Sequence, residues 1–164
     1  MTLKEDLLPA LAGNHLFSIF SQGEVERVLK HAAIEIFSDG ERIFVQGEDP
    51  DKFYLILSGG VTITQSIPRK TECALANLGE GETLGEMSFL DRFPRSATAV
   101  ANGATCLLAF EFASFDRLIA WDNELAVKWF WLFGRALAQR LREANERIKE
   151  LIEGRPGDTG IPSA

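Results

Sequence analysis

The pattern of hydrophobic and polar positions changes period twice along the chain. In the segment SQGEVERVLKHA, apolar residues recur at helical spacing from Val25 to Ala32. Ser21, followed three residues later by Glu24, has the form of a capping box, in which each residue satisfies a free donor at the start of a helix. The pattern therefore predicts an amphipathic helix that begins near Ser21.

From Ala33 to Phe112 the chain consists of short apolar or alternating runs of strand length, separated by Gly, Pro, Asp and Asn. Seven or eight such runs, most without a helix between them, favour an antiparallel jelly roll over a parallel α/β sheet. We therefore predict a mainly β domain of the α+β class, an eight-stranded antiparallel jelly roll with N-terminal helices and a long C-terminal helix. The runs are AIEIF, RIFV, FYLIL, VTITQSI, CALANL, SATAV and TCLLAFEF.

Helical periodicity returns after the strands. ASFDRLIAW predicts a short helix, and Asp122 or Asn123 is suited to cap a long helix from about Glu124 to Glu153. The domain is therefore predicted to span residues 1–153. The remaining residues, 154–164, are rich in Gly and Pro and are expected to form a disordered tail.

The predicted long helix carries an apolar seam whose spacing alternates between four and three residues, as in a coiled coil. The half up to Leu137 is apolar all round, and we expect it to pack on its own β domain. Past Arg140 the seam is narrow and flanked by charged residues, so this half is expected to pair with a second copy of the chain. The seam residues are Phe130, Gly134, Leu137, Leu141, Ala144, Ile148 and Leu151.

Charge and composition exclude several classes of function. The net charge of −7 argues against a dedicated nucleic-acid-binding domain, which is usually basic. No signal peptide or uninterrupted apolar span is apparent, so we expect a cytoplasmic protein that does not bind membranes. The two histidines, His15 and His31, lie outside the strand region, and no nucleophile motif or phosphate-binding P-loop is present. We predict no metal, no cofactor and no enzymatic activity.

Residues 79–100, GEGETLGEMSFLDRFPRSATAV, contain the densest chemical signal. A glycine-rich run leads into a short apolar helix that must end before Pro94. The start of that helix offers free backbone N–H groups to an anion, and Arg95 and Ser96 add a charged side chain and a hydroxyl. Glu86 would repel an anion unless it meets a donor, for which a ribose hydroxyl is suited. The segment therefore predicts a small phosphate site.

Two simpler interpretations remain open for these charged residues. Arg95 could be a surface arginine that pairs with Asp91 or Glu86. Glu86 could be an acid that interacts with the dipole at the start of its helix, which is compatible with a role in binding.

The same segment resembles the phosphate-binding cassette of the cyclic-nucleotide-binding domain. This domain occurs in bacterial catabolite activators, regulatory subunits of protein kinase A and cyclic-nucleotide-gated channels. The matching residues are LGEMSF, beginning at Leu84, and RSAT, beginning at Arg95, with ten residues from Gly85 to Arg95. The likeness extends over about residues 15–153.

The resemblance implies a role for each matching residue. Glu86 would bind the ribose 2′-hydroxyl, and Arg95 with Ser96 would bind the cyclic phosphate. In catabolite activators the base is capped by the long helix, partly from the other subunit, and the matching position able to hydrogen-bond is Asn145. The implied ligand-binding residues are Gly85, Glu86, Met87, Ser88, Arg95, Ser96, Ala97 and Asn145.

As a whole, the resemblance implies a cytoplasmic receptor for cAMP or cGMP that changes its C-terminal helix on binding and signals to a protein partner. A homodimer through that helix is expected. Because no helix-turn-helix follows the long helix in this chain, we expect a stand-alone module without direct DNA binding. The alternative is an interaction module that keeps only the scaffold, or a regulatory fragment of a longer transcriptional regulator, with no physiological nucleotide.

Overall fold

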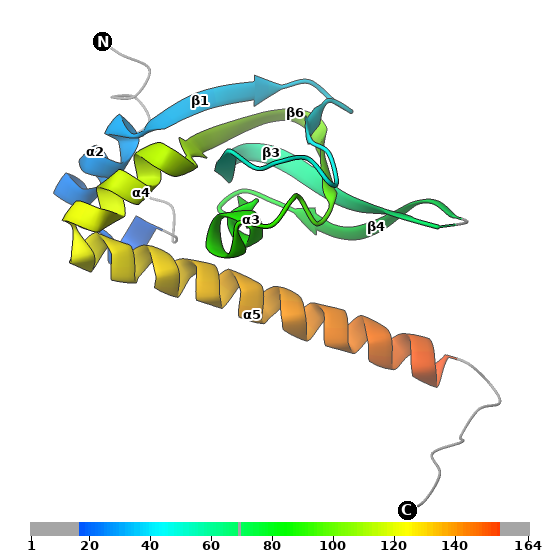
Figure 1. The fold of residues 1–164 in the computed structure, drawn as a ribbon. Coiled ribbons are helices and arrows are strands. Elements are labelled where there is room, and N and C mark those ends of the chain that lie inside the picture. Colours follow the sequence, from blue (N-terminus) through cyan, green and yellow to red (C-terminus); the bar gives the residue numbers. More distant parts are fainter. Residues whose placement is uncertain (1–16, 69, 155–164) are drawn as a thin grey trace, which may run out of the picture.

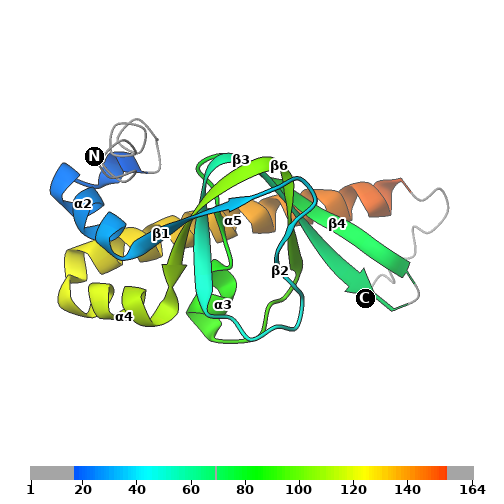
Figure 2. The same cartoon turned by 90° about the horizontal axis from the view of Figure 1, so that it is seen from above.

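The computed structural model describes residues 17–68 and 70–154 (Figure 1). A roll of antiparallel strands occupies the centre, the helices α2 and α4 lie together at one end of it, and the long helix α5 runs beneath the roll (Figures 1 and 2). In chain order the elements are η1 (Phe17–Ile19), α2 (Gln22–Lys30), β1 (Ala32–Phe37), β2 (Arg42–Phe44), β3 (Lys52–Ile67), β4 (Lys70–Leu78), β5 (Thr83–Leu84), α3 (Glu86–Asp91), β6 (Thr98–Glu111), α4 (Phe112–Trp121) and α5 (Asn123–Glu153).

The roll is built around two long strands, β3 and β6, that pair with each other along most of their length. Their antiparallel register runs from Lys52 opposite Glu111 to Thr64 opposite Thr98, with shifts on both sides of Ser58. The strand order is β1-β6-β3-β4, while β2 pairs with β6 and β5 pairs with β3. Every other element of the roll is therefore attached to one of these two strands.

The mainly β architecture with flanking helices is confirmed, but the prediction of eight strands is wrong. The described residues form six strands, because β3 joins FYLIL to VTITQSI and β6 joins SATAV to TCLLAFEF. Glycines interpreted as turns lie inside these strands and bend them. At Gly59 the φ angle is +84°, and an added Cβ would lie 2.5 Å from the carbonyl oxygen of Ala104. The pair of residues that forms β5 was not among the predicted runs.

The predicted helix boundaries agree with the structure. At the start of α2, the Ser21 backbone N–H donates to Glu24 Oε2 at 2.7 Å, and the Glu24 N–H donates to Ser21 Oγ at 3.4 Å, so the capping box is formed. At the start of α5, Asp122 Oδ1 accepts a hydrogen bond from the Leu125 N–H at 3.0 Å. Local capping chemistry thus fixes where both helices begin.

The two halves of α5 differ in what they bury. Trp129, in the first half, is fully buried and contacts a cluster of aromatic rings from the N-terminal segment, the roll, α4 and α5 itself. In the second half, Leu141, Ile148 and Leu151 are 63%, 55% and 71% exposed. The first half is therefore packed through Trp129, while the seam residues of the second half are largely exposed, and Leu141, Ala144 and Ile148 border a cavity of their own chain. Pairing of this half with a second copy stays a prediction. The rings that contact Trp129 belong to Phe17, Phe20, Phe53, Phe110, Phe115 and Phe133.

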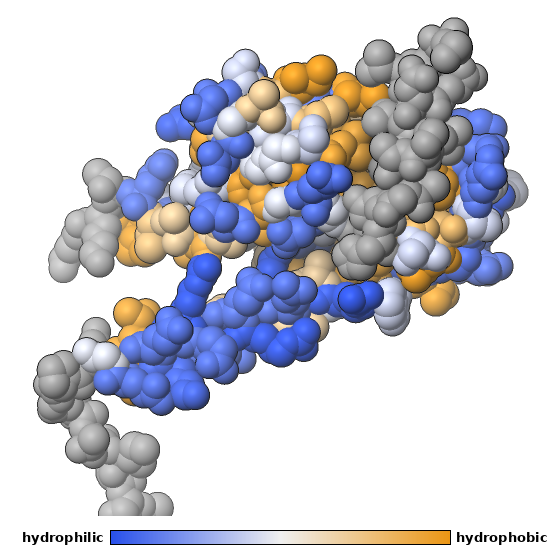
Figure 3. Space-filling view, turned by 180° about the vertical axis from the view of Figure 1, so that it is seen from behind, coloured by the Kyte–Doolittle hydropathy of each residue, from blue (hydrophilic) through white to orange (hydrophobic). Residues whose placement is uncertain are grey.

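The view from behind shows how the second half of α5 meets its surroundings. Polar side chains cover it on this side, and a hollow separates it from the roll (Figure 3).

Within the described ranges no helix is long and apolar enough to cross a membrane. The predicted disordered tail falls almost wholly on residues 155–164, which lie outside those ranges.

Candidate functional site

The short helix α3 begins and ends at residues in the left-handed region. Gly85 caps its start with φ +78°, and Arg92 caps its end with φ +60°. The helix ends at Asp91, three residues before Pro94, as the sequence predicted. Because these two bends limit the helix to Glu86–Asp91, its first turn stays next to Arg95, which follows the loop.

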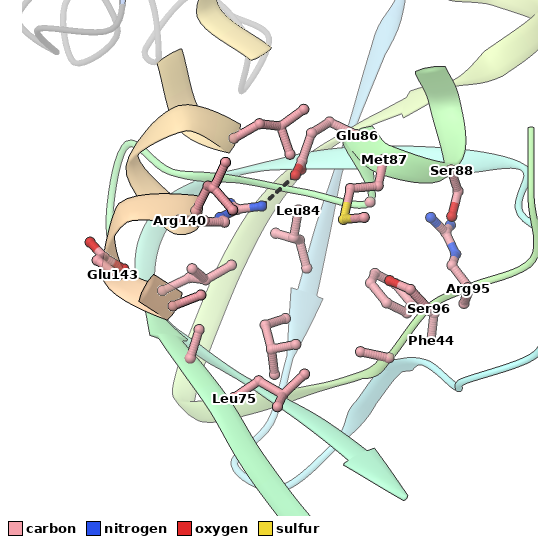
Figure 4. Close-up of a pocket in the computed structure, with 18 of the residues that line it drawn as sticks. Phe44, Leu75, Leu84, Glu86, Met87, Ser88, Arg95, Ser96, Arg140 and Glu143 are labelled. Carbon is pink, nitrogen blue, oxygen red and sulfur yellow. Dashed lines mark hydrogen bonds and ion pairs between the residues drawn. The ribbon is translucent and has the colours of Figure 1, made fainter. Parts of the chain in front are cut away.

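A cavity of about 510 Å³ opens between α3, the roll and the second half of α5 (Figure 4). Seven of the eight residues predicted to bind a ligand line it, and Asn145 is not among the lining residues. Asn145 is exposed on α5, so its contact with a base stays a prediction. The seven are Gly85, Glu86, Met87, Ser88, Arg95, Ser96 and Ala97.

Arg95 is a buried cation at one side of the cavity. Its exposed fraction is 4%, and Nη2 donates to the carbonyl oxygen of Lys52 at 2.6 Å. Burial lowers the pKa of the guanidinium. Within residues 17–68 and 70–154, Nη1 finds no acceptor and no carboxylate is within ion-pair distance. The alternative in which Arg95 pairs with Asp91 or Glu86 at the surface is therefore wrong.

Gly85 is required by the close approach of Arg95. A Cβ at this position would lie 2.6 Å from Arg95 Nη1 and 3.3 Å from the Lys52 carbonyl oxygen. Its φ of +78° also disfavours any other residue. The glycine thus allows the guanidinium to lie against the backbone at the start of α3.

Glu86 faces the opposite side of the cavity and forms an ion pair with Arg140 of α5 (Figure 4). Its exposed fraction is 1%, and burial raises the pKa of its carboxyl, while the Arg140 guanidinium acts in the opposite direction. The same guanidinium donates to the carbonyl oxygen of Thr83. Glu86 therefore connects the cassette to α5, in addition to its position at the start of α3.

The sequence analysis missed the two arginines by which α5 contacts the roll. Arg140 binds Glu86 and Thr83, and Arg147 donates from Nη1 to the carbonyl oxygen of Leu75 in β4. The signal that could have found them is their spacing. They lie seven residues apart, each directly before a seam residue, so both project from the same side of the helix.

The cavity thus has charged groups on two opposite sides and apolar walls between them. Arg95 lies on one side and Arg140 on the other, with Leu84 and Met87 between them (Figure 4). A ligand with an anionic group, a hydroxyl and a flat apolar part fits this arrangement. In the described part of the chain no three His, Cys, Asp or Glu side chains are grouped so as to hold a metal ion.

Comparison with known proteins agrees with this geometry. Residues 34–122 match the cyclic nucleotide-binding domain family. The chain belongs to this family. A solved cyclic nucleotide-binding domain from Methylobacillus flagellatus has 28% identical residues and a TM-score of 0.79, and the match covers 95% of this chain and 86% of that one.

Bacterial regulators share this cyclic nucleotide-binding domain. The Cyclic AMP receptor protein of Thermus thermophilus is 37% identical over 139 residues, which are 82% of this chain and 61% of that protein. A CRP-like cAMP-activated global transcriptional regulator of Mycobacterium tuberculosis is 30% identical over 71% of this chain and 50% of its own length. The chain therefore spans between half and two thirds of these relatives.

Proposed function

We propose that this domain is a receptor for a cyclic nucleotide, cAMP or cGMP. The observation that carries the proposal is Arg95, a buried cation that lines the cavity and has a free donor, as described above. A cyclic phosphate would supply the missing negative charge and accept from Nη1. The first backbone N–H groups of α3 and the hydroxyls of Ser88 and Ser96 would complete the anion site.

The ribose and base would occupy the rest of the cavity. The Oε1 atom of Glu86 accepts from Arg140, which leaves Oε2 for the 2′-hydroxyl of a ribose. The base would lie between the apolar wall of the roll and the side of α5 that carries Ala144 and Ile148. The volume is within the range of about 300 to 1,000 Å³ that is typical of small-molecule sites.

The domain is further proposed to act as a homodimer through the second half of α5. The exposed seam supports this, because an apolar stripe on an isolated helix remains in water until a partner covers it. Asn145 directly follows the seam residue Ala144, so in a parallel pair of helices it would border the second copy. From there it would reach the base in the partner's cavity rather than in its own.

Signalling would follow from the shared use of α5. The helix forms one wall of the cavity and would also form the dimer contact, so nucleotide affinity and helix position are expected to be coupled in both directions. The output is proposed to pass to a protein partner. Titration calorimetry with cAMP and cGMP tests the first step, with a dissociation constant expected in the micromolar range or below. Absence of heat and of thermal stabilisation at millimolar nucleotide would refute it.

A second candidate is an interaction module that keeps the scaffold without a physiological nucleotide. The ion pair between Glu86 and Arg140 favours it, because this buried carboxylate already has a partner. Calorimetry separates the two candidates, since the second predicts no binding of either nucleotide. The chain covers only part of the length of its relatives. This second candidate therefore includes the case in which the domain is a regulatory segment of a longer transcriptional regulator and binds no physiological nucleotide.

A further inference from the structure

Arg95 contacts an aromatic ring that the cassette pattern does not include. The Cζ atom of Arg95 lies 4.2 Å from the centroid of the Phe44 ring, in the range of a cation–π interaction. Phe44 ends β2, more than 50 residues before Arg95 in the chain, and both side chains line the cavity (Figure 4). We propose that Phe44 is a positioning residue, whose ring holds the Arg95 guanidinium in the orientation that binds an anionic phosphate.

The chain segment around Phe44 also fixes the backbone of Arg95. The Gly47 N–H donates to the Arg95 carbonyl oxygen at 2.8 Å, and the Arg95 N–H donates to the Glu48 carbonyl oxygen at 2.9 Å. One segment therefore holds both the main chain and the side chain of the arginine. These backbone contacts do not define the torsion angles of the Arg95 side chain. The ring of Phe44 can therefore orient the guanidinium, which the backbone contacts do not do.

The guanidinium has few other restraints. Among the described residues it has one hydrogen bond, to the Lys52 carbonyl oxygen, and it packs against the backbone at Gly85, and neither contact covers the face of the guanidinium that Phe44 meets. The face of Phe44 restrains the orientation of the guanidinium, because a planar cation over an aromatic face is attracted in a stacked orientation. Burial strengthens the attraction, since no water competes with it.

The ring is itself held in place by Tyr54. The two ring centroids are 6.3 Å apart, and the planes are inclined by 23°. Tyr54 is 5% exposed and lies in β3, so it does not move freely. Phe44 therefore contacts a buried ring of the roll as well as Arg95, so its position does not depend on the arginine alone.

This inference rests on the proposed function but has a readout that needs no nucleotide. Protons of a guanidinium above a ring face are shielded, so the Arg95 side-chain signals are expected upfield of those of exposed arginines in the NMR spectrum of the free protein. The signals that are missing from the spectrum of Arg95→Lys are assigned to Arg95. Phe44→Leu should remove the upfield shift, and Phe44→Tyr should keep it. A shift that persists in Phe44→Leu would overturn the inference.

The binding readout uses the same variants with cAMP and cGMP. Phe44→Leu should weaken binding on the order of 3- to 30-fold, whereas Phe44→Tyr should stay within twofold of the wild type. Leu75→Ala, which changes an apolar lining residue away from Arg95, is the matched control for loss of cavity wall, and its arginine signals should not move (Figure 4). Equal losses in Phe44→Leu and Phe44→Tyr would overturn the inference. Absence of binding by the wild type would refute the proposed function, while the arginine signal would still decide the role of Phe44.

Discussion

The two walls of the cavity are held by different kinds of interaction. The roll wall, which carries Arg95, is built from paired strands and from backbone hydrogen bonds that reach the arginine itself. The opposite wall is the second half of α5, which the side chains of Arg140 and Arg147 attach to the roll. The roll wall is therefore held through the backbone of paired strands, whereas the helix wall is held through side-chain contacts, which is the difference that the proposed coupling of ligand and helix requires.

The largest effect is expected from removing the charge of the roll wall. Arg95→Leu should weaken binding of a cyclic nucleotide by about 30- to 4,000-fold, because the phosphate loses its charge-assisted contact. The fold should remain, as judged by circular dichroism. Arg117→Leu, an exposed arginine of α4, is the control and should bind like the wild type. Binding of Arg95→Leu within threefold of the wild type would show that the phosphate lies elsewhere.

The next effect concerns the helix wall as a dimer contact. Leu141→Asp combined with Ile148→Asp places charges on the exposed seam, and ultracentrifugation should then detect only monomer. Nucleotide binding should weaken as well, both because the dimer is lost and because the two side chains line the cavity. Arg142→Asp combined with Lys149→Asp adds acidic groups away from the seam and should leave the dimer intact. A wild-type protein that remains monomeric at high micromolar concentration would contradict the dimer.

A smaller effect is expected from loosening the helix wall alone. Arg147→Ala removes the contact with the Leu75 carbonyl, so hydrogen exchange of residues 141–153 should increase while the roll stays protected. Arg140→Ala should affect the same segment more strongly, because it also leaves the buried Glu86 without its cation. Nucleotide should change exchange in this segment of the wild type. Unchanged exchange on adding nucleotide would refute the coupling of ligand and helix.

The smallest effect is a dependence of stability on pH that arises from Glu86. Burial raises the pKa of this carboxyl in the folded state, so folding favours its protonated form. Stability from this group is therefore present below the unfolded pKa and decreases as the pH rises from there through the raised folded pKa. Glu86→Gln should lose this contribution, which denaturant unfolding at several pH values would measure. If the free energy of unfolding depended on pH in the same way in the wild type and in Glu86→Gln, the raised pKa of Glu86 would be contradicted.

Sequence reasoning identified the cassette because its information is local. The glycine before α3, the stop before Pro94 and the arginine after the loop lie within a short segment, and in the structure Gly85 and Arg95 line the same cavity. The strand count failed for the opposite reason. Whether Gly59 turns the chain or bends a continuing strand depends on the close approach of Ala104, which no local pattern contains.

The contacts between residues far apart in the chain likewise could not be predicted from the sequence. Phe44 against Arg95 and Arg140 against Glu86 join residues whose proximity depends on how β2 and α5 pack on the roll. Helical periodicity indicated which side of α5 is apolar, but not that the polar residues beside the seam face the cavity. Composition also could not distinguish the buried Trp129 from Trp121, which is 91% exposed at the end of α4.

The pairing of β3 with β6 also determines when the molecule becomes able to bind. These strands are separated by β4, β5, α3 and the cassette loop, so the intervening chain must close into a long loop before their contacts form. During synthesis, β6 leaves the ribosome after the cassette, and Arg95 has no backbone partners on the segment of residues 47–48 until the roll closes. A nascent chain that already contains every cassette residue would therefore still be unable to hold a nucleotide.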